Sequence, residues 1–596
     1  MKNAKLLLLG LLLVLFGSFT ASIIQSSNNA INVNEIIVSA KNGAPLSARL
    51  FIPPNATTEN PAPAVIIAHG YVNQKEVMAN FSIEFARRGY VVIAPDLSGH
   101  GGSQVIDNDG SRGVGDILRY AHTLPFIDKA NVALVGHSMG GWSAVTAAVD
   151  NPELVRTLIV VGSAQGGHKV DFMLGAPWIP DDSPFNFGVE FGRYDEFVAI
   201  NYFDQKKAVD FVKSLWLMGP FHTDEPVQLG QVYGDFAKGT GRMATQSAET
   251  HAGVHQSKTA IANVIGMLDL SSPAPVQLAA QDQVWPYKEV ATACAYIGLI
   301  LFMLGVLIKA FSTPYFSSLI QPRKVHRPQA ALVYFTSVAL IIGAVAYLLV
   351  PLQMAAMQHL GVNELFPLLF ANTSLVFFAT VQLSFLGLFF VWHLCFAKNR
   401  GESLISYGLS TSTAQPEVRW GYLVKALGIA LLTVCSGYVL LTWVYSTLNV
   451  DVRWWMLLIR PLETHRLATA AAYVLPFSAI FLVNNLLAFG WLRMKDFGSA
   501  LRTGVIWTLA VFLVNALGVM IVITAQMASL YSTGQPYIGE VGYDTLLVIL
   551  GNGFIPLFAV TSLMSTYCLL RTGNIYTGSL LSGLLATWMV VCYQPY

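Results

Sequence analysis

The residues of this chain best placed to do chemistry form a G-x-S-x-G sequence at positions 136–140, with Ser138 at its centre. The apolar run 131–135 precedes it, and residues 141–148 read as a helix. A strand, a sharp turn and a helix in this order hold such a serine with its hydroxyl projecting above a sheet. Glycines beside the serine are needed because a side chain there would clash. The pattern predicts that Ser138 is a nucleophile, which a base must activate.

An acid that could orient such a base follows the serine in the chain. Residues 187–191 read as a strand, and the turn after it carries Asp195. We predict that Asp195 holds the tautomer of a histidine and stabilises its protonated form. Glu196, Asp204 and Asp235 are alternatives, and Asp195 could instead cap a helix.

The base is expected on the segment 249–255, which contains His251 and His255. An apolar-periodic helix at 258–268 follows and ends this part of the chain. A histidine before the last helix completes the chain order serine, acid, histidine. Only one of the two histidines can be the base.

Two backbone N–H groups are predicted to stabilise the negative oxygen that develops when the serine attacks. The apolar run 63–68 ends at His69-Gly70, and a loop after such a strand supplies one N–H group, which we assign to Tyr71. Met139, the residue after the nucleophile, supplies the other. The His69 side chain is interpreted as structural. Asp96 and His100 precede the serine, so they are expected to shape their glycine-rich turn.

The composition shows what must position these residues. The chain has 596 residues, of which 54% are hydrophobic and 12% charged, with a mean hydropathy of +0.53. A typical soluble protein has about 25% charged residues, so at least part of this chain is expected in a membrane. The formal net charge of +1 gives no reason to expect nucleic-acid binding. The five cysteines have no metal-ligand spacing.

The composition changes near residue 290 and divides the chain into three expected parts. Residues 1–28 contain a leucine-rich run that is a signal peptide or, as we favour, an uncleaved signal anchor. Residues 29–288 are expected to form an α/β domain, because short Val/Ile-rich runs alternate with helical stretches. Its strands are expected at 64–68, 90–95, 132–136, 157–162 and 187–191, its helices near 75–88, 113–124, 140–149 and 204–217, and a hairpin at 35–54.

Residues 289–596 are expected to form a membrane domain with about eight transmembrane helices. Its apolar runs have lengths suited to crossing a bilayer, at roughly 291–311, 329–352, 373–396, 421–446, 467–492, 503–527, 545–569 and 575–593. Polar residues within or beside these runs are expected to join helices, with substrate presentation and transport as alternatives: Gln382, His393, Asn484, Asn485, Asn515 and Asn552.

The positions of Lys and Arg predict the orientation of these helices, because cytoplasmic loops are enriched in both residues. With residues 29–288 outside the cytoplasm, three arginines fall on the outer side, Arg453, Arg460 and Arg466. Thirteen basic residues fall inside: Lys2, Lys5, Lys309, Arg323, Lys324, Arg327, Lys398, Arg400, Arg419, Arg493, Lys495, Arg502 and Arg571. We expect a multi-pass protein of a bacterial cytoplasmic membrane, with the α/β domain extracytoplasmic. Val452–Leu462 is expected along the outer bilayer interface.

Residues 35–270 resemble the α/β-hydrolase superfamily, especially its dienelactone-hydrolase, acyl-esterase and serine-peptidase-like branches. The resemblance is carried by residues 69–71, the turn 96–103, the motif 136–141, the turn 192–196 and Thr250-His251. It implies a doubly wound, mostly parallel sheet, a Ser138–Asp195–His251 triad, and no metal or organic cofactor. The choice of His251 over His255 rests partly on it, since a Thr-His pair before the final helix is usual there. We recognise no family for the membrane half, an all-α bundle.

These observations together predict a membrane-anchored serine hydrolase that cleaves carboxylic (acyl) esters through an acyl-enzyme. Its expected partners are a small-molecule or lipid-like ester and membrane lipid, and no protein partner is indicated. A serine peptidase or an acyltransferase of the same fold is the first alternative. A permease or signalling protein with a non-catalytic hydrolase-like domain is the second. Aromatic residues of the long connections 163–185 and 218–248 are expected to form a lid or acyl pocket, or to pack against the bilayer: Trp178, Phe185, Trp216, Phe221 and Tyr233.

Overall fold

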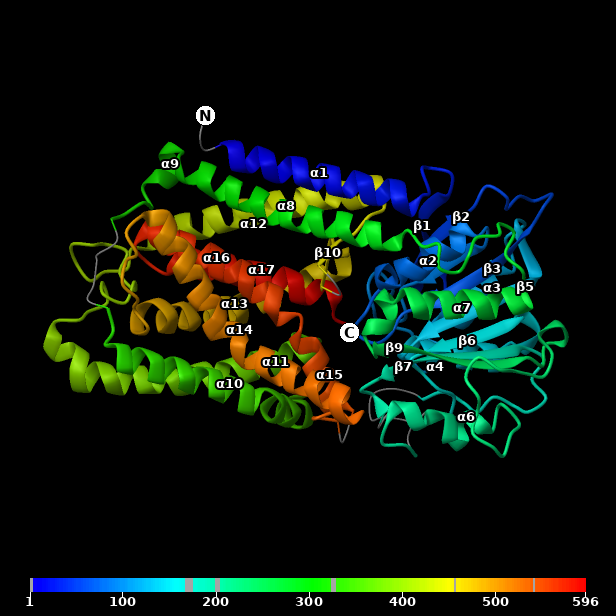
Figure 1. The fold of residues 1–596 in the computed structure, drawn as a ribbon. Coiled ribbons are helices and arrows are strands. Elements are labelled where there is room, and N and C mark those ends of the chain that lie inside the picture. Colours follow the sequence, from blue (N-terminus) through cyan, green and yellow to red (C-terminus); the bar gives the residue numbers. More distant parts are fainter. Residues whose placement is uncertain (1–3, 167–174, 199–203, 323–327, 455–456, 540–541) are drawn as a thin grey trace.

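The computed structural model has two parts, a β-sheet covered by helices and a long bundle of apolar helices (Figure 1). It describes residues 4–166, 175–198, 204–322, 328–454, 457–539 and 542–596. The sheet part lies at one end of the bundle, and the C-terminus lies where the two parts meet (Figure 1).

The sheet has nine strands in the order β1-β2-β4-β3-β5-β6-β7-β9-β8. Its six central strands, from β4 to β9 in this order, pair in parallel, whereas β1, β2 and β8 pair antiparallel at the edges. The strands are β1 (Asn32–Ser39), β2 (Pro45–Ile52), β3 (Ala62–Ala68), β4 (Val91–Pro95), β5 (Ile127–His137), β6 (Thr157–Val161), β7 (Asn186–Tyr194), β8 (Val232–Tyr233) and β9 (Arg242–Thr250). The predicted mostly parallel sheet is confirmed.

Helices cover both faces of this sheet, which explains why its strands are continuous apolar runs. Alternate residues of β3 point to opposite sides: Val65 and Ile67 pack in one core with α2 (Ala79–Arg87) and α7 (Lys258–Ser271). Ile66 packs in the other core with α3 (Val114–Ala121) and α4 (Met139–Asp150). The sheet is therefore fixed from both sides, and its strand ends are held in place.

Two local predictions for this part are wrong. The helix expected near 204–217 is only a 3₁₀ turn, Ala208–Lys213, followed by the single turn α6 (Leu215–Met218). Ser214 interrupts it, because its hydroxyl accepts a hydrogen bond from Trp216 N and begins a new turn. The expected long connection 218–248 contains part of β9, which pairs with β7 as a strand of the sheet.

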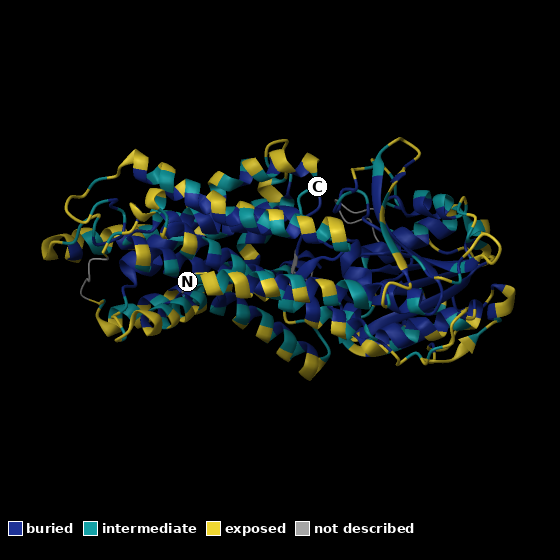
Figure 2. Ribbon diagram, turned by 90° about the horizontal axis from the view of Figure 1, so that it is seen from above, coloured by how far each residue is buried: buried dark blue, intermediate teal, exposed yellow. Residues whose placement is uncertain are grey.

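Nine helical segments among the described residues are long and apolar enough to cross a membrane, which matches the number predicted. The chain is therefore a membrane protein by length and composition of its helices. The segments are α1 (Lys5–Gln25), α8 (Trp285–Phe311), α10 (Ala331–Leu360), α11 (Leu369–Trp392), α12 (Trp420–Leu448), α13 (Leu467–Asn485), α14 (Ala500–Thr533), the broken pair α15 (Tyr543–Gly551) and α16 (Phe554–Thr572), and α17 (Tyr576–Tyr593). Their outward sides carry the exposed residues of the bundle (Figure 2).

Helix α1 packs lengthwise against α8 through glycines on both helices (Figure 1). A Cβ atom at Gly10 would lie 2.2 Å from Phe302 N, and one at Gly17 would lie 2.5 Å from Ala291 O. From the other side, a Cβ at Gly298 would lie 2.6 Å from Val14 N. Small residues that let two backbones approach this closely are typical of helix pairs inside membranes. Helix α1 therefore packs on α8 as closely as paired membrane helices do.

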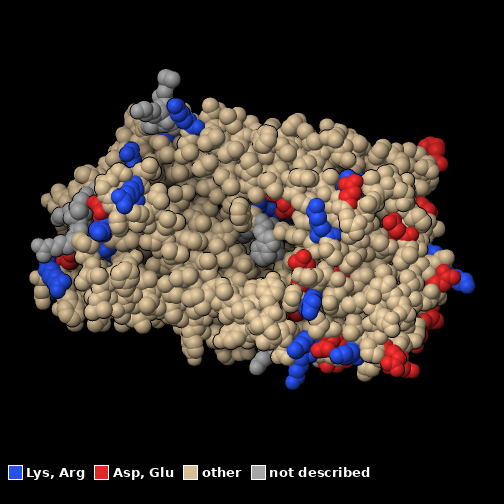
Figure 3. Space-filling view, viewed as in Figure 1, with Lys and Arg blue, Asp and Glu red and all other residues tan. Residues whose placement is uncertain are grey.

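Charged side chains concentrate toward the two ends of the long axis. In Figure 3, Lys and Arg gather at the end of the bundle away from the sheet, both signs cover the sheet part, and a broad uncharged surface lies between. This pattern agrees with the basic residues counted on the predicted cytoplasmic side. Lys2, Arg323, Lys324 and Arg327 lie outside the described residues, and the orientation stays a prediction.

The three arginines predicted on the outer side are buried where the bundle meets the sheet part. Arg460 Nη1 lies 3.3 Å from Glu76 Oε1 and 3.5 Å from Asp96 Oδ2. Arg466 donates through Nε to Gly101 O at 3.1 Å. Arg453 pairs with Glu289 at the start of α8. Buried charges require such partners, so these contacts fix the sheet part on the bundle.

The segment Val452–Leu462 provides two of these arginines, and its location along the bilayer interface stays a prediction. It contains the two-stranded hairpin of β10 (Val452–Trp454) and β11 (Leu457–Ile459). Arg453 and Arg460 are buried against the sheet part, because their acidic partners lie there and on α8. Trp455 lies outside the described residues.

Candidate active site

Ser138 occupies the turn between β5 and α4, with φ +54° and ψ −125°. A non-glycine residue in such a conformation is strained by about 1–3 kcal/mol, so its surroundings must impose it. The neighbouring glycines do so: a Cβ atom at Gly136 would lie 2.2 Å from Gly140 O, and one at Gly140 would lie 2.4 Å from Ala68 O. Ser138 N also donates to Val161 O at 3.0 Å. The strand and the helix therefore hold this serine at the sharp turn.

Asp195 and His251 meet beside the carboxyl ends of β7 and β9. His251 Nδ1 donates to the Asp195 carboxylate, 3.0 Å from Oδ2 and 3.1 Å from Oδ1. Phe197 N donates to Asp195 Oδ1 at 2.9 Å and so orients the carboxylate. Burial by itself would lower the pKa of His251, but the adjacent Asp195 and Glu196 carboxylates outweigh it and raise that pKa above its ordinary value of 6.5.

The alternatives to these two residues have other partners. Glu196 accepts a hydrogen bond from His251 N at 2.8 Å, and burial together with the Asp195 charge raises its pKa to about 7. Asp204 accepts from Ser214 Oγ at 2.6 Å, and Asp235 caps a turn by accepting from Ala237 N. His255 Nδ1 donates to Ala252 O at 3.1 Å. Of the candidates weighed from the sequence, the structure brings Asp195 and His251 together.

Ser138 and His251 line one hollow, which we call the serine hollow. It contains about 680 Å³ of empty space, and the predicted oxyanion residues Tyr71 and Met139 line it as well. Gly70 permits the approach of this loop, because a Cβ atom there would lie 3.1 Å from Ser138 Cβ. Residues 70, 71, 138, 139 and 251, from separate motifs along the chain, thus surround a single space.

Sequence reasoning missed two side chains that position His251. His137 Nε2 donates to His251 O at 3.1 Å, and its ring centroid lies 4.7 Å from that of His251. The Phe197 ring lies 4.5 Å from the His251 ring on centroids. Both also line the serine hollow. His137 directly precedes Ser138 in the G-x-S-x-G motif, and Phe197 directly follows the Asp195-Glu196 pair. Their positions beside predicted site residues were the signal that could have identified them.

The bundle forms one wall of the serine hollow, which the sequence did not indicate. Helix α15 contributes Tyr543, Leu546, Ile549 and Leu550 to its lining. The five aromatic residues proposed for a lid or acyl pocket are not among the described residues of this lining. They contact one another instead: the rings of Trp178 and Trp216 stack at 4.4 Å, and Phe221 contacts both Phe187 and Tyr233, while Phe185 is fully buried.

Asp96, His69 and His100 form hydrogen bonds within the hydrolase, His100 through Nδ1 to Ser98 O at 2.9 Å. Asp96 accepts hydrogen bonds from Gly102 N and Lys75 N, both at 2.9 Å, and Lys75 Nζ lies 2.8 Å away. His69 Nε2 accepts from Leu97 N at 3.0 Å, while its Nδ1 donates to Gly70 O. Burial lowers the pKa of His69, which keeps the ring neutral in this role.

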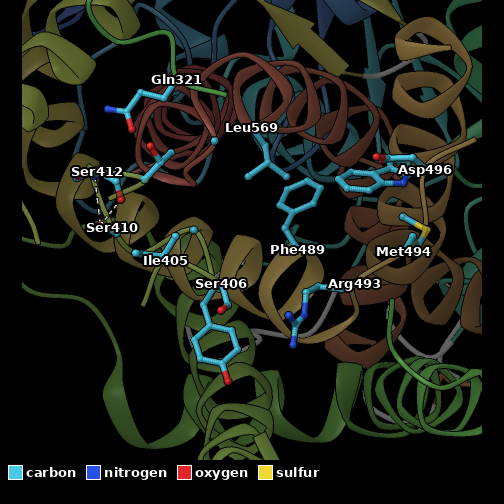
Figure 4. Close-up of a pocket in the computed structure, with 15 residues that line it drawn as sticks. Gln321, Ile405, Ser406, Ser410, Ser412, Phe489, Arg493, Met494, Asp496 and Leu569 are labelled. Carbon is cyan, nitrogen blue, oxygen red and sulfur yellow. Dashed lines mark hydrogen bonds between the residues drawn. The ribbon is translucent and has the colours of Figure 1, made fainter. Parts of the chain in front are cut away.

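A further pocket lies at the end of the bundle away from the sheet (Figure 4). It is lined by Phe489, Arg493 and Asp496 near the end of α13 and by the segment 405–413. Arg493 is already paired with Glu402 at 2.9 Å. None of the candidate catalytic residues lines this pocket, so the chemistry predicted from the sequence belongs to the serine hollow.

The sheet order, the strained serine turn and the Asp195–His251 pair define the class of protein: this chain contains an α/β hydrolase, followed by a membrane bundle. Residues 59–180 match the model of the family described as serine aminopeptidase, S33. That match includes the loop of Tyr71 and the motif around Ser138.

Curated relatives match about a sixth of the chain. An uncharacterized protein of Mycobacterium tuberculosis is 35% identical over 105 residues, 17% of this chain and 29% of that protein. A 2-hydroxy-6-oxononadienedioate/2-hydroxy-6-oxononatrienedioate hydrolase of Burkholderia vietnamiensis is 37% identical over 107 residues, 17% of this chain and 37% of that protein. The chain thus spans about a third of the length of these relatives.

Two solved structures are also similar to part of the chain. One is a putative dienelactone hydrolase from Klebsiella pneumoniae, with 18% identity and a TM-score of 0.31, covering 41% of this chain and 99% of that one. The other is Est1E from Butyrivibrio proteoclasticus, with 16% identity and a TM-score of 0.25, covering 36% of this chain and 90% of that one.

Proposed function

We propose that this protein is a membrane-anchored serine hydrolase that cleaves carboxylic (acyl) esters, with Ser138 as nucleophile, His251 as base and Asp195 as the acid that orients it. The observation that carries the proposal is the strained backbone of Ser138, with φ +54°, beside a hollow that His251 also lines. Strain of this kind persists where function requires it and the surroundings impose it. The proposal agrees with the finding that the chain contains an α/β hydrolase.

In the proposed reaction, Ser138 Oγ attacks the carbonyl carbon of the ester while its proton passes to His251 Nε2. Nε2 is the nitrogen for this step, because Nδ1 donates to Asp195. The tetrahedral intermediate collapses as the bond to the alcohol oxygen breaks, and that oxygen takes the proton from His251. Water then attacks the acyl-enzyme by the same route and releases the acid and free Ser138. A different acceptor in place of water would give acyl transfer.

The N–H groups of Tyr71 and Met139 are proposed to bind the carbonyl oxygen as it becomes negative. Met139 is the first residue of α4, where N–H groups have no partner within the helix. The positive end of the helix dipole adds to this attraction. Fixed donors of this kind act without reorganisation during the reaction.

The lining of the serine hollow favours an ester over a peptide with a free amino terminus. Its described residues include no aspartate or glutamate, whereas an ammonium group taken out of water needs a negative partner. The wall from α15 is mostly apolar. An aminopeptidase activity, which the description of the family model raises, is therefore the second candidate.

We also propose the three parts expected from the sequence: a retained signal anchor in residues 1–28, an extracytoplasmic hydrolase domain in 29–288 and a membrane domain in 289–596. The close packing of α1 on α8 supports a retained anchor, since cleavage would remove a helix from the bundle. The basic residues at the far end of the bundle support the orientation, in a bacterial cytoplasmic membrane.

The test uses the full chain in lipid nanodiscs and a short fluorophosphonate probe. We expect the wild type to be labelled and to hydrolyse p-nitrophenyl butyrate, and Ser138→Ala to lose labelling and at least about 10⁴-fold in activity. Ser39→Ala is the matched control, because Ser39 is exposed at the end of β1. Labelling that survives in Ser138→Ala would refute the proposal. A preference for aminoacyl-nitroanilides over p-nitrophenyl esters would replace the ester by a peptide substrate.

A further inference from the structure

The serine hollow adjoins a second cavity at the junction of the two parts. This junction cavity contains about 800 Å³ of empty space. It shares four lining residues with the serine hollow, Val72 and Asn73 from the hydrolase and Ile549 and Leu550 from α15. The space around Ser138 is therefore bounded on one side by side chains that also face the bundle.

The junction cavity in turn adjoins a cavity inside the bundle. This bundle cavity contains about 900 Å³ of empty space. Tyr593 of α17 lines both spaces. Three cavities thus follow one another from Ser138 into the membrane-spanning helices.

The lining of the bundle cavity suits a hydrocarbon chain. Six phenylalanines and several aliphatic residues form most of it: Phe378, Phe385, Phe477, Phe481, Phe554, Phe558, Ile341, Val345, Val381, Ile480, Leu487, Leu492, Val514, Leu557 and Val590. Its few polar residues include Gln382, Asn484 and Asn515. These are three of the polar residues noted within the membrane spans, so they gather around one space.

The helix that separates the bundle from the serine hollow is broken beside the junction cavity. Helix α15 ends at Gly551 and α16 begins at Phe554, while Asn552 and Gly553 line that cavity. Irregular backbone at membrane depth is tolerated where it lines a cavity or is buried in protein. Broken helices of this kind surround binding sites in membrane transporters, and here the break lies between Ser138 and the bundle.

On the other side of Tyr71 and Met139 lies a crevice of about 940 Å³, which we call the polar crevice after the wall that the hydrolase gives it. That wall contains Ser98, His100, Asn108, Asp109 and Arg112, whereas the opposite wall, from the bundle, is mainly apolar and includes Val362, Pro367 and Phe370. Tyr71 and Met139 therefore separate the mostly apolar serine hollow from a space with one polar wall. An ester bound at Ser138 would have its acyl and alcohol parts on different sides of this boundary.

We infer that the substrate is a long-chain acyl ester of a polar alcohol, taken from the membrane, whose hydrocarbon chain lies in the junction and bundle cavities. The polar alcohol part lies in the polar crevice. This inference rests on the proposed function, because it assigns a substrate class to the same serine. The bundle is then part of the substrate-binding site as well as an anchor, because its cavity holds the acyl chain. On binding, this chain moves from the apolar interior of the membrane to an apolar protein cavity.

The first experiment compares chain lengths in nanodiscs. Ala586→Phe fills part of the bundle cavity, which Ala586 lines from α17. We expect this variant to lose about tenfold or more in kcat/KM for p-nitrophenyl palmitate, equivalent to about 1.4 kcal/mol, with p-nitrophenyl butyrate hydrolysis and fluorophosphonate labelling unchanged. The matched control is Ala479→Phe, at an exposed alanine on the outer side of α13, which should leave both esters unaffected.

The second experiment needs no substitution and decides the matter if Ala586→Phe does not fold. A hexadecyl fluorophosphonate with a diazirine at its chain end is attached to Ser138 and then photolysed. We expect crosslinks to the bundle cavity, on α11, α13, α16 or α17. Crosslinks confined to the hydrolase or to lipid would overturn the inference. It would also be overturned if Ala586→Phe and Ala479→Phe both lost hydrolysis of the palmitate and butyrate esters to the same extent. Failure of the short probe to label Ser138 would instead refute the proposed function itself.

Discussion

Replacing Arg460 by methionine should loosen the hydrolase from the bundle. The Arg460 side chain is buried, and its guanidinium lies 3.3 Å from Glu76 and 3.5 Å from Asp96, both fully buried carboxylates of the hydrolase. Methionine has a similar length and no charge, so the variant removes the ion pairs and keeps much of the volume. Asp96 also holds the turn that follows β4, through Gly102 N.

The magnitude follows from these distances and from the partners that remain. At an effective dielectric constant of about 20, each pair has a Coulomb attraction of about 5 kcal/mol, much of which offsets the cost of burying the charges. Removing one partner of a buried pair typically costs about 3–5 kcal/mol. Glu76 keeps Arg49 at 3.5 Å and Asp96 keeps Lys75 at 2.8 Å, so we expect the lower end, about 3 kcal/mol. For a domain of this size that corresponds to a fall in Tm of about 6–12 °C.

The assay is thermal unfolding of the full chain in nanodiscs, followed by tryptophan fluorescence. Lys213→Met is the control, because Lys213 pairs with Asp210 at 2.8 Å on the surface with 60% of its side chain exposed. Exposed pairs contribute about 0–1 kcal/mol, so this Tm should change by less than about 4 °C. The double variant Arg460→Met/Glu76→Gln should lose less than the sum of the two single variants, since both changes remove the same ion pair. If Arg460→Met lowers Tm no more than Lys213→Met, the reasoning is refuted.

Three further predictions concern the serine turn, the histidine and the first helix. Gly140→Ala should abolish fluorophosphonate labelling, because its Cβ would lie 2.4 Å from Ala68 O, while Gly266→Ala, where a Cβ meets nothing within 4 Å, should label normally; equal labelling of the two would contradict this. Ester hydrolysis should rise with pH to a plateau as His251 loses its proton, with a midpoint above 6.5 because Asp195 and Glu196 outweigh burial in setting the pKa of His251. Asp195→Asn should shift the midpoint of the residual activity to lower pH. A midpoint that stays fixed in this variant would exclude this role of Asp195. Intact mass spectrometry should find residues 1–28 on the mature protein, and a mature protein that starts after residue 21 would contradict the retained anchor. Gly17→Leu should lower the Tm, because even a Cβ atom at this position would lie 2.5 Å from Ala291 O.

Much of the hydrolase fold could be predicted because its signals are local. The run 131–135, the glycines around Ser138 and the helix after them lie within a few residues of one another and specify the turn together. The parallel strands are continuous apolar runs because both faces of the sheet are covered. Hydropathy also located the membrane spans, since a helix in lipid must be apolar over its whole length.

The partners of Ser138 could be predicted only through chain order, and their roles stay predictions. Asp195 was chosen from its position after a strand, and His251 from its position before the last helix. The structure places these two side chains in contact, but the sequence contained no direct signal for that distance. Glu196 received less weight, although it holds the His251 backbone at 2.8 Å.

Contacts between the two parts could not be predicted, because they join residues hundreds of positions apart. Leu546 lines the hollow of Ser138, yet in the sequence it is one of many leucines in an apolar run. Arg460 lies between tryptophans and leucines typical of an interfacial segment, and its partner Glu76 lies in an expected helix. Neither pattern indicates that the two side chains neutralise each other.

The glycine contacts between α1 and α8 also constrain how the protein is made. Residues 26–284 lie between these two helices, so the entire hydrolase is synthesised before α8 emerges to meet α1, and in the proposed orientation it must also cross the membrane. Once the two helices associate, both ends of the hydrolase are tethered at adjacent points on the same bundle. The two connections therefore limit how far the hydrolase can turn away from the bundle, in addition to the ion pairs that hold it there.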